Sequence, residues 1–454
     1  MSPSPAPAAP AQRTGGHDGC GCPGAGPSRR SVLAVLGLTG AAVAASSALS
    51  SRVAFAATPG PTDTLVVLSM RGGWDGLSIV APVGDPDYAR IRPNIGLPSS
   101  LALPAGGVFG LHPALAPLQP LWAAGSFGAV HAVGQPSGSR SHFRDSEELE
   151  RAAPGNSLRT GWLDRVLALR GSGTAFQAVE LGSEMVPSSL AGPMPAMAMS
   201  AVDEFQLSVW DGVRPQFRTA LAALHAGVTH PVAQQASTTL AAVDTTAAMK
   251  AAGYTPANGA VYPTSDLGKG LRDLARLIKA NVGLQIACLD YGDWDMHHDI
   301  GKPGDARGWM HRQLADVAGS LAAFAADLGS ALGRVSVVTL SEFGRRAAEN
   351  GSGGADHGHG QAVLLSAGAS SAGRCTARGR AWLLARSTRG TSQASPTTAR
   401  CSASCCKSGA ASGRSTRSSP ASPPHRSGWR RRSEAAAGSP AARRRRNCRH
   451  PRSH

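Results

Sequence analysis

The sequence has almost no cysteine in the region where a folded core is expected. Of its eight cysteines, only Cys288 lies between Cys22 and Cys375. A single thiol cannot form a disulfide within this region. The sequence therefore excludes a core that is cross-linked by disulfides.

Acidic residues are nearly absent from the last part of the chain. Residues 367–454 contain 19 of the 45 Lys and Arg residues but only one acid, Glu434, so the rest of the chain carries a net charge of −2. A formal net charge of +16 would ordinarily suggest a nucleic-acid partner. Because the excess belongs entirely to this tail, we expect no nucleic-acid partner.

Long apolar runs are also lacking, apart from one near the N-terminus. The segment S-R-R-S-V-L at 28–33 precedes an Ala-rich run and the small-residue triplet A-F-A at 54–56. Paired arginines before a short, weakly hydrophobic run are typical of a twin-arginine export signal, with a Sec signal or an anchor helix as the alternative. We expect residues 1–57 to be a signal peptide that the twin-arginine translocase recognises. The mature chain would be periplasmic or extracellular, and since no run of about 18 apolar residues follows, we expect no stable membrane span.

Hydrophobic periodicity predicts helices followed by strands. Residues 267–278 and 310–328 repeat apolar side chains at helical spacing, and strand-like runs follow them at 284–289 and 335–340. A further buried strand is expected at 64–69. Helix-then-strand repeats predict an α/β domain with a mostly parallel sheet, which we place at residues 58–366. The Ala-rich segment 100–265 is expected to be mainly helical or irregular.

From about residue 366 onward hydrophobic periodicity disappears. A disordered basic tail is the simplest interpretation, but five cysteines and two tryptophans are unusual in such a tail. A one-base shift of the codon frame permits an amphipathic helix, D-L-A-G-L-A-D-Y-R-A-V-L-G-E-L-L-Q-K, over residues 391–407. We therefore hypothesise that residues 367–454 are read out of frame and that the preceding domain is incomplete. Resequencing the gene tests this hypothesis.

Two motifs in the first half of the chain hold candidate functional side chains. The motif R-G-G-W-D-G-L places Asp75 beyond the carboxyl end of the first strand, where ligands bind in open α/β sheets. Asp75 could instead cap the following helix. The motif S-R-S-H-F brings together Arg140, Ser141 and His142, which could supply a nucleophile or bind an anion, or form a solvated loop.

Acids and histidines gather after the two later strands. The segment D-Y-G-D-W-D-M-H-H-D holds Asp295 and His297, whose oxygen and nitrogen donors suit zinc, manganese or a similar divalent ion. Glu342 follows the last strand. The Gly-rich segment G-G-A-D-H-G-H-G could wrap closely round a metal with Asp356, His357 and His359. Hydrated or flexible loops have the same composition, but three strands that each end in such residues favour one shared site.

Together these motifs resemble those of the domain-of-unknown-function 1501 family of exported bacterial proteins. The similar segments are R-G-G-W-D-G-L, S-R-S-H-F, G-D-W-D-M-H, S-E-F-G-R-R and G-A-D-H-G-H-G, and the likeness covers about residues 62–366. The shifted frame of the tail resembles that family's carboxyl end. Met296 stands where the family usually has Thr, beside the retained Asp295 and His297.

The resemblance implies a doubly wound, mostly parallel sheet of alkaline phosphatase-like type, here followed by the out-of-frame tail. It implies two divalent ions, zinc or manganese, and a small anionic phosphate or sulfate ester as substrate. Ser141 would be the nucleophile and Arg140 would stabilise the anion, while His142 would be a ligand or an acid/base and Glu342 a ligand or an outer partner. The implied metal ligands are Asp75, Asp295, His297, Asp356, His357 and His359. A non-catalytic exported binding or assembly protein, or a truncated product without function, is the alternative.

Overall fold

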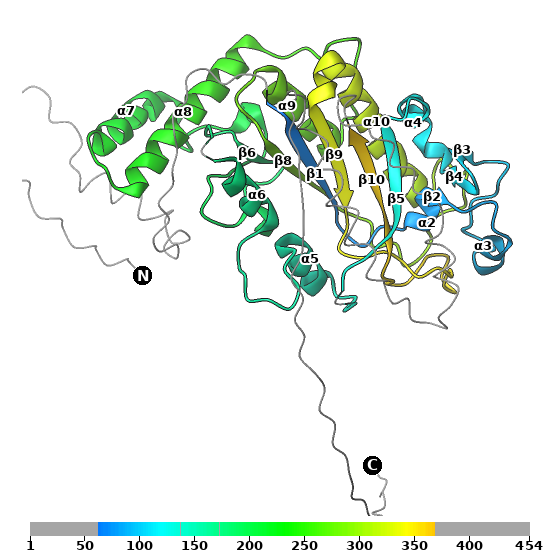
Figure 1. Cartoon of the computed structure of the whole chain (residues 1–454). Helices are drawn as coiled ribbons and strands as arrows, with labels where there is room; N and C mark the ends of the chain where they lie inside the picture. The colour runs from blue at the N-terminus through cyan, green and yellow to red at the C-terminus, as the bar shows by residue number, and fades with distance from the viewer. Residues whose placement is uncertain (1–61, 137, 172, 368–454) are drawn as a thin grey trace, which may run out of the picture. The chain divides into compact units, whose positions relative to one another are not determined.

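A central sheet organises the part of the chain that the computed structural model describes, residues 62–136, 138–171 and 173–367 (Figure 1). The predicted signal peptide and, apart from Ala367, the predicted out-of-frame tail lie outside these residues.

Seven strands form this sheet in the order β5–β10–β9–β1–β8–β6–β7. The run from β9 to β7 pairs in parallel, while β10 is antiparallel to both β9 and β5. The predicted α/β class with a mostly parallel sheet is therefore confirmed. The strands are β1 Thr64–Met70, β5 Phe127–Val133, β6 Ala178–Leu181, β7 Met197–Met199, β8 Ile286–Tyr291, β9 Val335–Leu340 and β10 Gln361–Ala367.

Helices cover both faces of the sheet. Because successive side chains of a strand point to opposite faces, Val66 and Leu68 of β1 pack in one cluster with α9 (Asp266–Lys279) and α10 (Trp309–Leu328). Val67 packs on the other face with Leu163 of α6 (Trp162–Arg170). Burial on both faces explains why the sequence of β1 is almost continuously apolar.

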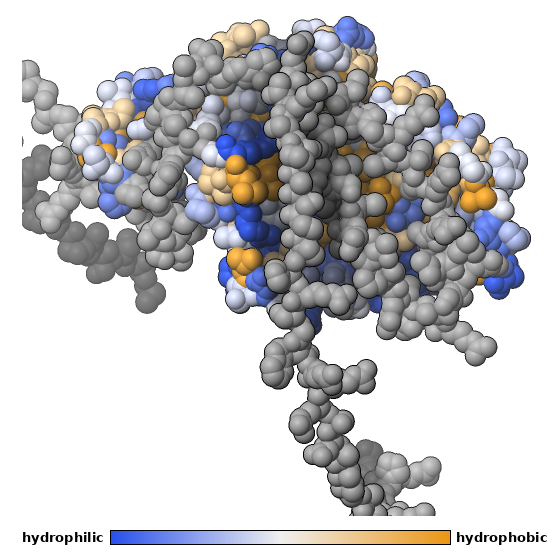
Figure 2. All heavy atoms as spheres, in the orientation of Figure 1, coloured by the Kyte–Doolittle hydropathy of each residue, from blue (hydrophilic) through white to orange (hydrophobic). Residues whose placement is uncertain are grey.

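The remaining elements lie around this core. A small antiparallel sheet joins β2 Val80–Ala81, β4 Phe109–Leu111 and β3 Leu103–Gly106. The other α-helices are α2 Gly76–Ile79, α3 Pro86–Ile91, α4 Gln119–Ala123, α5 His142–Arg151, α7 Arg214–His225 and α8 Pro231–Ala252. The 3₁₀ helices are η1 Pro113–Leu118, η2 Ser188–Leu190, η3 Val202–Glu204, η4 Asp211–Val213 and η5 Gly329–Arg334. On the face in view, Figure 2 shows hydrophobic residues interspersed with hydrophilic ones.

The segment Trp309–Arg334 departs from one expectation. By length and composition it could cross a membrane, although we expected no such stretch after the signal peptide. Half of its most apolar part is buried inside the fold, where α10 packs against α9 and η1. A helix that packs into a protein core can be as apolar in composition as a membrane span.

Most predicted elements are confirmed, and several strands are new. The observed bounds of β1, β9, α9 and α10 lie within one residue of the predicted ones, and β8 begins two residues later than expected. The segment expected to be helical or irregular also contains the strands β3, β4, β5, β6 and β7. These strands are short or rich in Gly and Ala, which have low β-propensity.

Candidate metal centre

The histidines and acids of three separate motifs meet at one edge of the sheet. The loop after β8 carries Asp295 and His297, the loop between β9 and β10 carries His357, and α5 begins at His142. The parallel strands β1, β8 and β9 all end at this edge, which is where open α/β sheets bind ligands.

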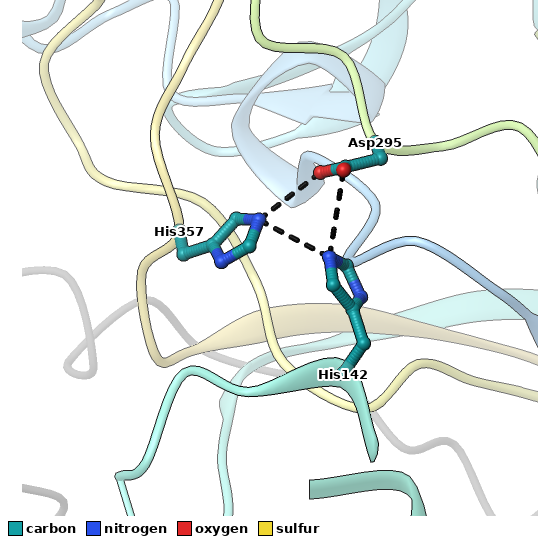
Figure 3. A group of neighbouring side chains, drawn as sticks. All are labelled: His142, Asp295 and His357. Carbon is teal, nitrogen blue, oxygen red and sulfur yellow. Dashed lines mark hydrogen bonds and ion pairs between the residues drawn. The ribbon is translucent and has the colours of Figure 1, made fainter.

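His142, Asp295 and His357 point their ligand atoms at one another (Figure 3). The two Nε2 atoms are 3.2 Å apart. Asp295 Oδ1 lies 3.1 Å from His357 Nε2, and Oδ2 lies 3.5 Å from His142 Nε2. Two imidazoles and a carboxylate so close together are a donor set that zinc and related divalent ions prefer.

Hydrogen bonds on the far side of each ring fix the tautomers of both histidines. His142 Nδ1 lies 2.6 Å from Glu342 Oε1, and His357 Nδ1 lies 3.0 Å from the carbonyl oxygen of Arg140. A carbonyl oxygen can only accept, so the Nδ1 of His357 carries the proton. The Glu342 carboxylate also accepts from the Gly72 amide and from Ser341 Oγ, and His142 Nδ1–H is its third donor. In its neutral form, each imidazole therefore directs its Nε2 lone pair at the other ring and at the Asp295 carboxylate. These acceptors repel one another unless a cation lies among them.

His297 adds a fourth candidate metal ligand to this group. Its Nε2 is 2.9 Å from His357 Nε2 and 3.0 Å from Asp295 Oδ1. Its Nδ1 faces Asp356 Oδ1 at 3.6 Å. A hydrogen bond from the Asn350 side chain is the main cause that lowers the pKa of Asp356, so this carboxylate remains ionised beside the ring.

Arg345, which the sequence did not single out, holds Asp295 in place. Its buried guanidinium donates to Asp295 Oδ1 at 2.5 Å. The same group also donates to the carbonyl oxygens of Gly72, Gly73, Trp294 and Ala355. Burial raises the pKa of Asp295, but the hydrogen bond and the positive charge of Arg345 outweigh it and lower that pKa to about 2. Asp295 is therefore a permanently charged acceptor at physiological pH.

Glycines allow the loops of this edge to approach closely. Gly72 has a φ of +118°, and a Cβ there would lie 2.6 Å from the backbone nitrogen of Asp295. A Cβ on Gly358 would lie 2.3 Å from the carbonyl oxygen of Arg345. Any larger residue at these two positions would push apart the loops that deliver the candidate ligands.

Residues 121–378 match a family described as protein of unknown function (DUF1501). The chain belongs to this family. No curated protein shows a significant match to it. Among solved structures it is similar to the lipoteichoic acid synthase LtaP from Listeria monocytogenes, with 10% sequence identity, 70% of each chain covered and a TM-score of 0.25. A likeness at this TM-score supports no conclusion about the fold or the activity.

In this DUF1501 protein, Asp75 does not join the histidine cluster. Asp75 is the N-cap of α2 and accepts from the Leu77 amide, as the alternative interpretation of its motif expected. Its buried carboxylate also pairs with both terminal nitrogens of Arg92 and accepts from Ser78 Oγ at 2.6 Å. Metal coordination by Asp75 stays a prediction, and it would require this ion pair to open.

Three other predicted residues take different places in the DUF1501 chain. Arg140 acts on the cluster through its backbone carbonyl, at a residue with φ of +56°. Ser141 is exposed at the N-cap of α5, and its Oγ makes no hydrogen bond to any described residue. The ring of His359 lies against Gly134, and burial lowers its pKa. Its Nε2 has no hydrogen-bond partner among the described residues.

An open cleft of about 670 Å³ leads to the cluster. His142 and Asp295 of the cluster line it, together with Glu342. We call the lining residues Arg71, Phe143, Glu147, Glu150 and Asp293 the outer wall; this wall carries three acids and one cation, and Phe143 is 91% exposed. The other lining residues are Gly72, Ser146, Ser188 and Gly292.

Behind this wall, β6 carries a buried acid, Glu180, which is only 1% exposed. Burial, reinforced by the negative charge of Asp290, raises the pKa of Glu180 to about 8. The folded chain therefore binds this proton more tightly than the unfolded chain. The stability gained from protonation is complete below the unfolded pKa of about 4.5 and is lost as the pH rises to about 8.

We expect the Glu180→Gln variant to lose less stability than the parent between pH 5 and pH 8. The parent should lose on the order of 2–4 kcal/mol of unfolding free energy through this group, because Gln cannot ionise and Glu must. Urea unfolding at several pH values measures the difference. Glu184→Gln, at an exposed position on the next loop, should leave the pH dependence unchanged. An equal slope in the parent and Glu180→Gln would contradict the prediction.

Proposed function

We propose that this protein is a metal-dependent hydrolase of small phosphate or sulfate esters, with its metal centre at His142, Asp295 and His357. The observation that carries the proposal is the convergence of two imidazole nitrogens and a carboxylate oxygen, which lie within 4.8 Å of one another. Such a group fits a divalent cation better than it fits a structural hydrogen-bond network.

The surrounding residues have separate tasks in this proposal. Glu342 and the Arg140 carbonyl keep the protons of the two imidazoles on Nδ1. Arg345 keeps Asp295 charged and oriented. A divalent ion held here would polarise the oxygens of a bound ester and lower the pKa of the attacking group. Ser141, next to His142 at the start of α5, is the candidate nucleophile.

Metal content and hydrolysis test the proposal. The full chain is equilibrated with Zn²⁺ or Mn²⁺ and desalted, and its bound metal is measured. Turnover of nitrophenyl phosphate and nitrophenyl sulfate is then followed. We expect Asp295→Asn to lower the metal affinity by roughly 10- to 100-fold and to lower turnover with it, because one charged ligand is lost.

The matched control is Asp299→Asn, in the same loop at a side chain that is 91% exposed. This control should keep the metal and the turnover of the parent. A parent that binds no metal would overturn the proposed centre. Metal binding without turnover would favour a non-catalytic binding protein, and full turnover in Ser141→Ala would remove Ser141 as the nucleophile.

A further inference from the structure

A second charged group lies beside the cleft, apart from the metal centre; Arg71 and Glu150 of this group line the cleft, and Asp290 pairs with Arg71 next to it. Arg71 donates to Glu150 Oε1 at 2.6 Å and to Asp290 Oδ2 at 3.0 Å. One guanidinium therefore faces two carboxylates, which leaves a net negative charge. Arg71 is the only Lys or Arg among the residues that line the cleft, so no uncommitted cation is present there to bind a second anionic group.

Glu180 adds an unpartnered oxygen to this group. It pairs in register with Cys288, so its side chain lies on the same face of the sheet as Asp290, two residues further along β8. Its Oε2 is buried without a hydrogen-bond partner among the described residues. The charged groups around it are Asp290 of β8, Arg71 after β1 and Glu150 of α5. The thiol of Cys288, which Ser189 contacts, lies on the same side. An unpaired buried carboxyl group destabilises the fold unless a ligand supplies a donor.

The spacing of these acids fits an organic cation better than a metal ion. Among the described residues, the one group with ligand atoms close enough to hold a metal is His142, Asp295 and His357. Glu150, Asp290 and Glu180 are not such a group, and Arg71 stands between the first two. An ammonium group donates hydrogen bonds to separate acceptors and does not need them all within one coordination shell.

We propose that Glu150 and Asp290 bind the ammonium group of a substrate, with the buried carboxyl group of Glu180 behind them as a further acceptor. The exposed ring of Phe143 offers an apolar or cation–π surface to the chain that bears this group. The substrate class would then be aminoalkyl phosphate or sulfate esters, with the ester at the metal centre and the amine at the outer wall. The choice of ester rests on the proposed function, whereas the ammonium site does not.

Binding to the metal-free full chain tests the site independently of catalysis. Hexylammonium and hexanesulfonate have the same chain length and opposite charge. We expect hexylammonium to bind about tenfold or more tightly than hexanesulfonate, since it gains charge-assisted hydrogen bonds. Calorimetric titration measures both affinities. Asp290→Asn and Glu150→Gln should each weaken hexylammonium binding by about tenfold.

The control is Glu147→Gln, which removes an acid of the same helix that also lines the cleft but pairs with Arg151. It should leave hexylammonium binding unchanged. Equal weakening by Glu147→Gln would show that only the general negative charge of the cleft attracts the cation, and would overturn the site. Equal affinity for the two probes would also overturn it.

A second measurement is the number of protons released when hexylammonium binds. A cation beside Glu180 favours its charged form, so titrations at pH 7 in buffers of different ionisation enthalpy should show proton release, and Glu180→Gln should show none.

Hydrolysis separates the two proposals. Turnover of 6-aminohexyl phosphate should exceed that of hexyl phosphate at low substrate concentration, and Asp290→Asn should abolish the preference by raising KM for the amino ester alone. Preferential binding of hexylammonium without turnover of either ester would sustain the ammonium site and overturn the hydrolase. Equal turnover of the two esters, with no preference in binding, would overturn the ammonium site and sustain the hydrolase.

Discussion

Replacing Arg345 by Met is expected to lower the free energy of unfolding by roughly 3–5 kcal/mol. The buried guanidinium donates to Asp295 and to carbonyl oxygens in the loops that follow β1, β8 and β9. Its removal leaves the carbonyl oxygens of the buried residues Gly73, Trp294 and Ala355 without this donor, and each unsatisfied buried acceptor is costly. Urea unfolding followed by circular dichroism measures the change.

Arg346 provides the matched control for Arg345. Its side chain is 57% exposed and makes a long ion pair, 3.7 Å, with Asp356, so Arg346→Met should change the stability by less than about 0.5 kcal/mol. Arg345→Lys should fall between the two, because an ammonium keeps the charge beside Asp295 but cannot reproduce the planar fork. Similar losses in Arg345→Met and Arg346→Met would show that the interloop bonds contribute little. Weaker Co²⁺ binding by Arg345→Lys in folded protein would show that Arg345 also positions Asp295.

Sequence patterns predicted the core elements because those elements are buried on defined faces. The helical spacing of Leu267, Leu271 and Leu274 corresponds to the face of α9 that packs on the sheet. By contrast, β6 has the sequence A-V-E-L and carries Glu180 in its interior. Because one of its four residues is acidic, the hydrophobic pattern of this segment does not predict a buried strand. Tertiary contacts, here the pairing with β7 and β8, determine the secondary structure of such a segment.

The candidate centre was partly predictable for a similar reason. Parallel strands that end at one edge bring their following residues together, so Asp295, His297 and His357 could be grouped in advance. The hydrogen bonds that hold these residues in place were not predictable from the sequence. The role of Arg345 depends on backbone carbonyls of three loops, and the tautomer of His142 depends on Glu342 across 200 residues of sequence. No local sequence pattern predicts these long-range contacts.

Asp75 provides the other large expected effect. Asp75→Asn should destabilise the fold by roughly 3–5 kcal/mol, because the buried Arg92 would lose its charged partner. Burial opposes ionisation of Asp75, but Arg92 and Ser78 hold the pKa of this carboxyl below its usual range. The charge of Asp75 is thus part of a structural pair, and metal affinity per folded molecule should stay at the level of the parent.

Two further variants separate capping, charge pairing and metal binding at Asp75. Asp85 caps α3 in the same way at a half-buried position, and Asp85→Asn should change the stability by less than about 0.5 kcal/mol, since Asn is also a good N-cap. The double variant Asp75→Asn/Arg92→Met should recover part of the lost stability, because no unpaired charge remains buried. Urea unfolding and the bound-metal assay give both quantities. If Asp75→Asn lost its metal while keeping its stability, Asp75 would be a ligand and the ion pair with Arg92 would open on metal binding. Loss of stability with retained metal would make Asp75 the anchor of the loop after β1, and would restrict the centre to the donors around His357.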